Sequence, residues 1–166
     1  MAIPGPVGLA IKIALLTGLR SEEILYIHRQ EACNVQSCDC SNLHIIDGQN
    51  GLSVVIINWF HDKQRCYLTM LPTRLLESFR TFVSVNEHDL ANAEKAVMQS
   101  AGIDFDELRE IFFCVMRSTM MAREFAVLTG KATPEAARDC ITYKRDSMAN
   151  QYCKAWEKFG VILPVI

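Results

Sequence analysis

The sequence predicts an α+β, mostly α-helical domain that contains one small three-stranded antiparallel sheet. Two observations predict this class. Apolar residues recur at helical spacing toward both ends of the chain, whereas the middle holds short β-branched runs separated by turn residues. With 166 residues, of which 50% are hydrophobic, the chain is long enough for a single domain with a proper core. We therefore expect one domain over residues 1–166.

The first two helices are expected to meet at a tight junction. Residues Val7–Leu16 are almost wholly apolar, which is typical of a helix buried on most faces. Gly18 is a natural C-terminal residue for it, and Ser21 is expected to cap a second helix with Glu22–Glu23 in its first turn. Arg20 is thereby placed between two helices, where capping of carbonyls or pairing with a glutamate is the simplest explanation.

The middle of the chain predicts a meander of three short strands. The segment Asp47–Gly51 is a strong turn signal between the first two β-branched runs, and the polar break His61–Gln64 separates the second from the third. Lys63 is expected at this second hairpin. The strands are expected at Leu43–Ile46, Leu52–Ile57 and Arg65–Leu71.

The remainder of the chain is predicted to be helical. Pro72 ends the sheet, because proline cannot donate to the strand ladder. Four or five helices are expected after it, at Thr73–Phe82, Asp89–Ser100, Asp104–Leu128, Pro134–Met148 and Asn150–Phe159. The apolar tail Val161–Ile166 is expected to pack on its own domain rather than on a neighbouring protomer, since it would otherwise expose a large apolar patch.

The charge and the ends of the chain limit the function classes. A net charge of −2 is mildly unfavourable for a nucleic-acid-binding protein, because such domains usually carry a basic surplus. No apolar run is long enough to span a membrane, and no charged leader precedes an apolar segment. The abrupt entry into a buried-looking helix suggests a piece of a longer protein.

The seven cysteines are scattered and are interpreted mainly as reduced intracellular thiols. Three are expected in or near the core: Cys66, Cys114 and Cys140. A second group surrounds one loop: Cys33, Cys38, Cys40 and the nearby His44. Its spacing matches no zinc-ribbon pattern. A metal site, a Cys33–Cys38 disulfide and a polar loop with free thiols stay open, and the last is favoured.

Further along the chain, residue types suited to phosphate chemistry occur, although each has an ordinary structural explanation. Lys63 in a hairpin discourages edge pairing, and Arg109 near a helix start can form an i,i+3 pair. Lys131 follows Leu-Thr-Gly in a loop, and Tyr143 is at the polar end of the next helix, where a tyrosine is most often half-buried.

Taken in order, these positions resemble the catalytic domain of tyrosine recombinases, from about Leu9 to Phe159. "TGLRSEEI" (17–24) resembles the first arginine box of that family. "DELREIFF" (106–113) is similar to the second box, where many members have His-x-x-Arg. "LTGKATPEAARDCITY" (128–143) resembles the Leu-Gly-His segment followed by the nucleophilic tyrosine. The basic residue other than histidine after the glycine is closest in look to archaeal viral integrases.

The resemblance implies a site-specific recombinase or integrase that cleaves and rejoins double-stranded DNA without a cofactor or a metal ion. Tyr143 would attack the phosphorus and form a 3′-phosphotyrosyl intermediate. Arg20 and Arg109 would stabilise the charge on the phosphate oxygens, at roughly 3 kcal/mol per donor. Lys63 would protonate the leaving 5′-oxygen, and Lys131 would hold the scissile phosphate in place of the usual histidine.

The resemblance also implies partners and a setting. The chain would be the C-terminal part of a longer recombinase that lacks its N-terminal DNA-binding domain. It would assemble into a dimer or tetramer on DNA, in the cytoplasm of the host cell, for a task such as integration of a viral genome. An inactive DNA-binding protein of the same fold and an unrelated helical interaction module remain as alternatives.

Several positions depart from the family pattern. Asp106 occupies the place of the histidine in the second box, either as an orienting residue or turned away. The Lys131-to-Tyr143 spacing is a residue or two longer than usual, which leaves Tyr152 as a second candidate nucleophile. Arg65 competes with Lys63 for the hairpin role. Lys144–Arg145 could contact the DNA backbone, although a solvated helix end is favoured.

Overall fold

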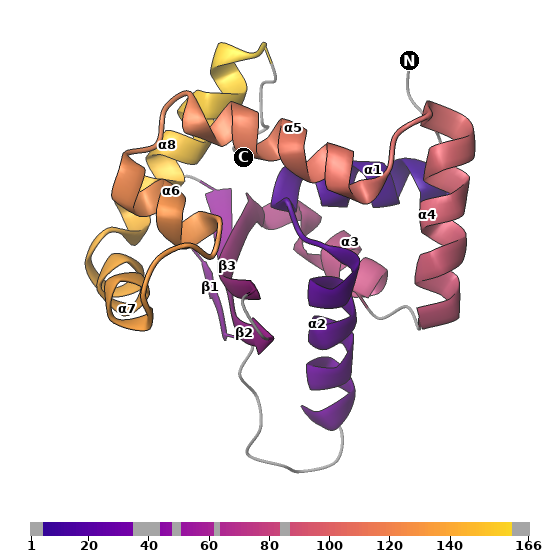
Figure 1. Ribbon diagram of the computed structural model, residues 1–166, viewed down its shortest axis with the longest axis horizontal. Helices are drawn as coiled ribbons and strands as arrows, with labels where there is room; N and C mark the ends of the chain where they lie inside the picture. Colours follow the sequence, from indigo (N-terminus) through magenta and orange to yellow (C-terminus); the bar gives the residue numbers. More distant parts are fainter. Residues whose placement is uncertain (1–4, 35–43, 48–50, 62–63, 84–86, 161–166) are drawn as a thin grey trace. The chain divides into compact units, whose positions relative to one another are not determined.

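The computed structural model of the chain describes residues 5–34, 44–47, 51–61, 64–83 and 87–160. Helices predominate and the chain also contains a small antiparallel sheet (Figure 1), which confirms the mostly helical α+β class. The chain divides into two compact units. The first comprises Met1–Ser41 and Leu75–Phe112, and the second comprises Asn42–Arg74 and Phe113–Ile166. Within the described ranges, no helix has the length and apolar character needed to cross a membrane.

The first unit is built from helices alone. They are α1 (Gly5–Thr17), α2 (Ser21–Asn34), α3 (Leu76–Val83), α4 (Glu87–Ala101) and the first turns of α5 (Phe105–Arg117). Helix α1 packs against α3 and α4, and α2 packs against α3. The core consists of fully buried apolar side chains from all these helices, among them Ile13, Ile24, Ile27, Phe79, Val97 and Phe112. Of the described residues of α1 only Lys12 is exposed, which explains why its sequence carries almost no polar face.

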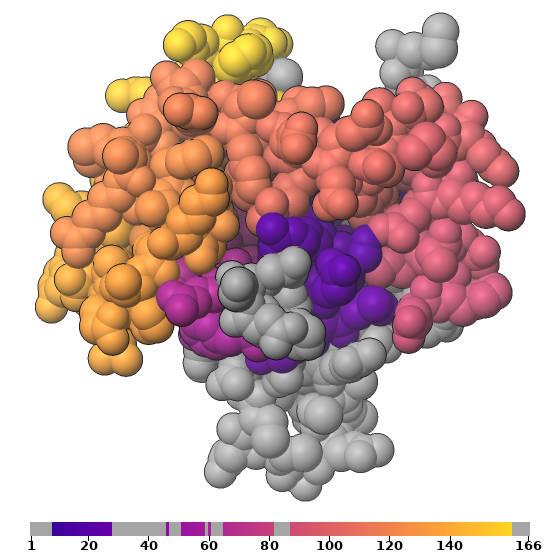
Figure 2. Space-filling view, viewed as in Figure 1, coloured from indigo at the N-terminus to yellow at the C-terminus, as the bar shows by residue number. Residues whose placement is uncertain are grey.

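The second unit combines the sheet with three helices. Strands β1 (His44–Asp47), β2 (Leu52–His61) and β3 (Gln64–Pro72) pair antiparallel in the order β1-β2-β3, and helices α6 (Ala122–Leu128), α7 (Pro134–Tyr143) and α8 (Arg145–Lys158) follow. Helix α6 packs on β3, α8 packs on β2, and α7 contacts both helices (Figure 1). In the space-filling view these three helices, coloured orange to yellow, form much of this unit's visible surface (Figure 2).

A bulge interrupts the pairing of β2 with β3 close to their hairpin. Ile56 lies opposite Leu68, whereas Trp59 lies opposite Cys66, so β2 carries one extra residue. Asn58 in this bulge has φ of +50°, a left-handed conformation that asparagine tolerates better than most residues. Beyond the bulge, Phe60 lies opposite Arg65. The bulge therefore shifts by one residue which side chains of β2 lie opposite the start of β3.

Two long helices that the sequence predicts are each broken. The expected helix Asp104–Leu128 is divided into α5 and α6, because Ser118 and Thr119 turn the chain with tight i→i−3 hydrogen bonds, of 3.1 and 3.2 Å. The expected helix Pro134–Met148 ends at Tyr143, since Lys144 leaves helical geometry with φ of −122° and ψ of 3°. As a result, α8 begins at Arg145 rather than near Asn150, and six helices, α3 to α8, follow the sheet in the described part.

The cysteine predictions are partly correct. Cys66 and Cys140 are buried free thiols, as expected, but Cys114 is exposed on α5, so its placement in the core was wrong. Cys33 lies within α2 rather than in a loop. Cys38, Cys40 and the apolar tail Val161–Ile166 are outside the described residues.

Candidate active site

The first candidate residue, Arg20, is held at the junction of α1 and α2. Gly18 ends α1 with φ of +62°, and its N–H donates to the carbonyl of Ala14 at 2.9 Å. This is the left-handed helix end that glycine adopts at least cost. The next residue, Leu19, is buried, so the backbone leading to Arg20 is anchored in the core.

Glu23 fixes Arg20 through two hydrogen bonds. The Arg20 backbone N–H donates to Oε2 of Glu23 at 2.9 Å, and Arg20 Nη1 donates to Oε1 at 3.0 Å. Arg20 is therefore the N-cap residue of α2, one position before the predicted cap Ser21, and Glu23 acts as the N3 partner of a capping box. The hydroxyl of Ser21 instead donates to Glu94 on α4.

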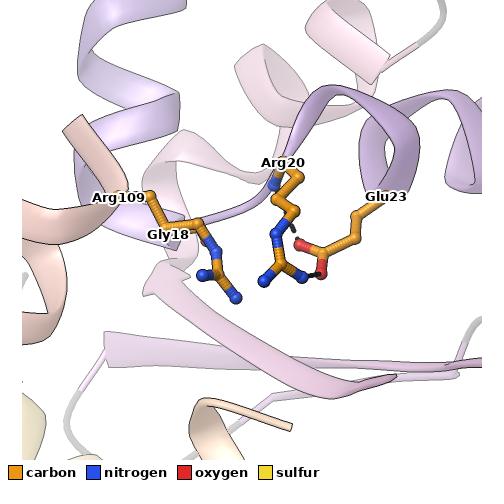
Figure 3. A network of polar contacts seen from close by, with 4 residues as sticks. All are labelled: Gly18, Arg20, Glu23 and Arg109. Carbon is orange, nitrogen blue, oxygen red and sulfur yellow. Dashed lines mark hydrogen bonds and ion pairs between the residues drawn. The ribbon is translucent and has the colours of Figure 1, made fainter. Parts of the chain in front are cut away.

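Arg109 reaches the same place from α5. Its Nε donates to the carbonyl of Gly18 at 2.9 Å, across 91 residues of sequence. Figure 3 shows the guanidinium groups of Arg109 and Arg20 directed to the same side, with Arg20 between Arg109 and the Glu23 carboxylate. Both arginines are near enough to Glu23 to lower its pKa, although burial raises that pKa more than they lower it. The structure thus brings together the two predicted arginines.

The approach of α5 to this junction depends on Gly18. A Cβ atom at Gly18 would lie 2.2 Å from Cδ1 of Phe112, whose ring is fully buried. Phe112 is three residues beyond Arg109 and therefore lies on the same side of α5. The glycine thus permits a close contact that holds Arg109 over the end of α1.

Sequence reasoning identified both arginines and gave pairing of Arg20 with a glutamate as one simple explanation, and Glu23 is that glutamate. Glu23 is 1% exposed, whereas the side chain of Arg20 is 24% exposed. Asp106, which was expected either to orient a neighbour or to be turned away, is exposed. The signal for Glu23 was present in the Arg-x-x-Glu spacing, because an N-cap residue and the residue three positions later face each other across the first turn.

The second unit holds Lys131 in a tight turn. Gly130 has φ of +72°, and the N–H groups of Lys131 and Ala132 both donate to the carbonyl of Ala126, at 2.8 and 3.0 Å. Thr133 then caps α7 by accepting from the N–H of Ala136 at 3.3 Å. The Lys131 side chain is exposed on this well-anchored turn.

Strand β3 supplies two further polar groups to this turn. The hydroxyl of Tyr67 donates to the carbonyl of Ala132 at 2.7 Å, and Arg65 Nη1 donates to the same carbonyl at 3.3 Å. Arg65 Nη1 also lies 3.4 Å from the Tyr67 hydroxyl. Arg65, which the sequence suggested only as a competitor of Lys63, is therefore a neighbour of Lys131.

Tyr143 is the last residue of α7 and is 79% exposed. At 1.5 Å per residue, the 10 residues of α7 place it about 15 Å along the helix from the turn that carries Lys131. The structure therefore does not bring Lys131 and Tyr143 together. Lys63 falls outside the described residues.

The second candidate nucleophile, Tyr152, is unsuited to attack a substrate. Its side chain is fully buried and packs against Trp156, with ring centroids 6.3 Å apart. Burial raises the pKa of its phenol, because the charged form loses its hydration. Tyr143 remains the exposed tyrosine of this region.

The two basic residues that follow Tyr143 are Lys144 and Arg145. Lys144 is exposed at the break between α7 and α8, and Arg145 Nε lies 3.7 Å from Oδ1 of Asp146. Across the described segments, no group of three or more His, Cys, Asp or Glu residues could hold a metal ion.

Comparison with protein-family models, with curated proteins and with solved structures finds no match to this chain.

Proposed function

We propose that this protein is a site-specific DNA recombinase or integrase that cleaves and rejoins double-stranded DNA through a 3′-phosphotyrosyl intermediate. The observation that supports this best is that the guanidinium groups of Arg20 and Arg109 lie side by side, with Arg20 held by the buried Glu23 and Arg109 held by the Gly18 carbonyl (Figure 3). Two guanidinium groups fixed side by side suit a phosphate in a transition state, because each can donate parallel hydrogen bonds and neither loses its charge. Arginines that serve only solubility would not be expected to converge in this way.

In this proposal the chain's own residues carry every step. The Tyr143 oxygen attacks the phosphorus, a P–O bond forms to tyrosine, and the bond to the 5′-oxygen breaks. Lys63 gives its proton to that leaving oxygen. Arg20 and Arg109 stabilise the negative charge on the non-bridging oxygens, and Lys131 binds the scissile phosphate. The reverse steps rejoin the strand.

The length of α7 keeps the Tyr143 nucleophile away from a phosphate bound at Lys131. Because Lys131 and Tyr143 lie at opposite ends of the helix, Tyr143 must move toward the phosphate or act on a phosphate bound by a neighbouring copy. Self-association into a dimer or tetramer on DNA would supply such a copy.

The separation of Lys131 from Tyr143 also favours a second function. A DNA-binding protein of this type that no longer cleaves DNA would keep the arginine pair and would not need Tyr143 near Lys131. The two functions differ in one measurable outcome, the covalent adduct.

The test is trapping on a nicked or suicide duplex in the presence of EDTA, followed by a denaturing gel. The recombinase should give a denaturant-stable adduct without metal, and Tyr143→Phe should abolish it. A mixture of Tyr143→Phe with Arg20→Ala, each inactive alone, should restore the adduct if the tyrosine acts on a phosphate held by a neighbour. Duplex binding without an adduct under any of these conditions would favour the non-cleaving protein.

A further inference from the structure

We propose that Arg65 and Lys131 form one phosphate-binding pair on the second unit and that Tyr67 positions both of them. The inference rests on the proposed function and deepens it, since Lys131 is the residue assigned there to the scissile phosphate. It assigns phosphate binding to Arg65 rather than proton donation. It also gives a role to Tyr67, a buried residue of β3 that the proposed chemistry does not use.

The first observation is that Arg65 touches the chain on both sides of Lys131. A Cβ atom at Gly130 would lie 1.9 Å from the Arg65 carbonyl oxygen, so the backbone of Gly130 rests directly on β3. On the other side, Arg65 Nη1 donates to the carbonyl of Ala132 at 3.3 Å. The residues before and after Lys131 both contact Arg65. The backbones that carry the Lys131 and Arg65 side chains are therefore adjacent.

The second observation is that this place is rigidly built. Tyr67 is 1% exposed, and its hydroxyl donates to Ala132 at 2.7 Å while lying 3.4 Å from Arg65 Nη1. Residues two apart on a strand share a face, which places Tyr67 beside Arg65. The ring of Phe60 packs edge-on against Tyr67, with centroids 5.6 Å apart. A cation that is already held in position loses less freedom on binding a ligand.

The third observation concerns the donors that remain. A guanidinium carries five N–H groups. In the part of the chain that the structure describes, the Arg65 guanidinium donates only through Nη1, to Tyr67 and Ala132. Nε and Nη2 are therefore available for the forked contact that arginine makes with phosphate. The backbone N–H groups of Lys131 and Ala132 are used within the turn, so a phosphate would be bound by side chains.

The acidic side chain of Glu135 lies close enough to Arg65 for their charges to interact. The pKa of Glu135 is lowered by hydrogen bonds from its own backbone and from Thr133, and to a lesser degree by Arg138 and Arg65. Glu135 is thus a charge that a phosphate approaching Arg65 would meet. Its removal should strengthen phosphate binding, an effect opposite in sign to the loss of either cation.

The test measures the affinity of a fluorescently labelled duplex of random sequence against salt concentration. One phosphate contact contributes about 0.9 to the slope of log K against log salt, or about 8-fold in affinity at 0.1 M salt relative to 1 M. Arg65→Ala and Lys131→Ala should each reduce the slope and the affinity for the duplex by amounts of this order. The double variant should lose less than the product of the two, because both residues bind the same phosphate.

Matched variants distinguish positioning from general charge. Arg123→Ala removes an exposed arginine of the same unit that is paired with Asp139 at 3.1 Å, and it should leave the slope unchanged. Tyr67→Phe should weaken binding in the wild-type background but have little effect when Arg65 is alanine. Glu135→Gln should tighten binding. Arg65→Lys keeps the charge and loses the fork, so it should retain the slope and lose affinity.

The inference would be overturned if Arg65→Ala and Arg65→Lys both left the slope and the affinity unchanged. It would also be overturned if the affinity loss of the Arg65→Ala, Lys131→Ala double variant equalled the product of the two single losses. Failure of the wild-type protein to bind the duplex would overturn it too. These results are distinct from failure of the proposed function, which is shown by duplex binding without a covalent adduct.

Discussion

Replacing Gly18 by alanine should destabilise the protein more than the same replacement at Gly102. Both glycines belong to the first unit and both have left-handed backbones, with φ of +62° and +70°. They differ in their surroundings. A Cβ at Gly18 would lie 2.2 Å from the buried ring of Phe112, whereas a Cβ at Gly102 would have no heavy atom within 4 Å. The pair therefore separates backbone strain from steric conflict.

The magnitudes follow from these two contributions. A left-handed alanine costs about 1–2 kcal/mol of the free energy of unfolding, and this cost is shared by both variants. Forcing a methyl group into a packed core adds about 1–3 kcal/mol. We therefore expect losses of about 1–2 kcal/mol for Gly102→Ala and about 2–5 kcal/mol for Gly18→Ala, a large part of a typical stability of about 5–15 kcal/mol.

Urea unfolding followed by circular dichroism measures both losses, and adduct formation on the suicide duplex provides a second measurement. Because the Gly18 carbonyl accepts from Arg109 Nε, Gly18→Ala should also slow adduct formation, whereas Gly102→Ala should not. Adding Phe112→Leu should recover part of the steric loss. Equal destabilisation by the two alanine variants would refute the contact with Phe112 and, with it, the explanation of how Arg109 is held.

Three further changes test the two polar clusters. The pKa of Glu23 is raised by burial, so its contribution to stability is fully present below pH about 4.5 and is lost as the pH rises through the folded-state pKa. Urea unfolding should show the wild type losing stability over that window relative to Glu23→Gln, and a relative gain would contradict the assignment. Arg109→Lys cannot keep both the Gly18 contact and a forked phosphate contact, so single-turnover trapping should slow by roughly 100-fold; an unchanged rate would remove Arg109 from the chemistry. Tyr67→Phe removes the hydrogen bond to Ala132 and should cost about 1 kcal/mol in thermal unfolding, whereas no loss would show that this bond does not hold the turn.

The end of α1 and the position of β2 were well predicted from the sequence. Gly18 was expected to end α1 and does so, because only glycine enters the left-handed region there without strain. The expected strand Leu52–Ile57 lies within β2, since its β-branched run suits a strand buried on both faces. The extension of this strand to His61 could not be predicted, because the ends of a strand depend on pairing with its neighbours.

The helix breaks could not be predicted from periodicity. No proline or glycine lies at Ser118–Met121 or at Lys144, so the local pattern continues as if the helix did. The first break is stabilised from a distance. The hydroxyl of Thr119 donates to the backbone carbonyl of Gln151 at 2.8 Å, and the N–H of Met121 donates to the Gln151 side chain at 3.0 Å. Such contacts are decided by tertiary packing.

Contacts between residues far apart in the sequence also form the candidate site, and periodicity does not predict them either. Arg109 and Gly18 are 91 residues apart, and no periodic pattern indicates that they meet. Arg65 meets the turn that carries Lys131 for a similar reason, since β3 and α6 pack together. Glu23 is the exception, because pairing of Arg20 with a neighbouring glutamate was among the explanations drawn from the sequence, and the three-residue spacing identifies Glu23 as the partner.

The most direct test of the central claim is to locate the DNA on the protein. Adduct formed on a suicide duplex in EDTA can be digested with nuclease and protease, and the modified peptide identified by mass spectrometry. The account predicts a nucleotide joined through its 3′-phosphate to Tyr143, with loss of the modification in Arg20→Ala and roughly 100-fold slower modification in Arg109→Lys. A nucleotide on any other residue, or a Tyr143 that stays unmodified while the duplex is bound, would contradict it.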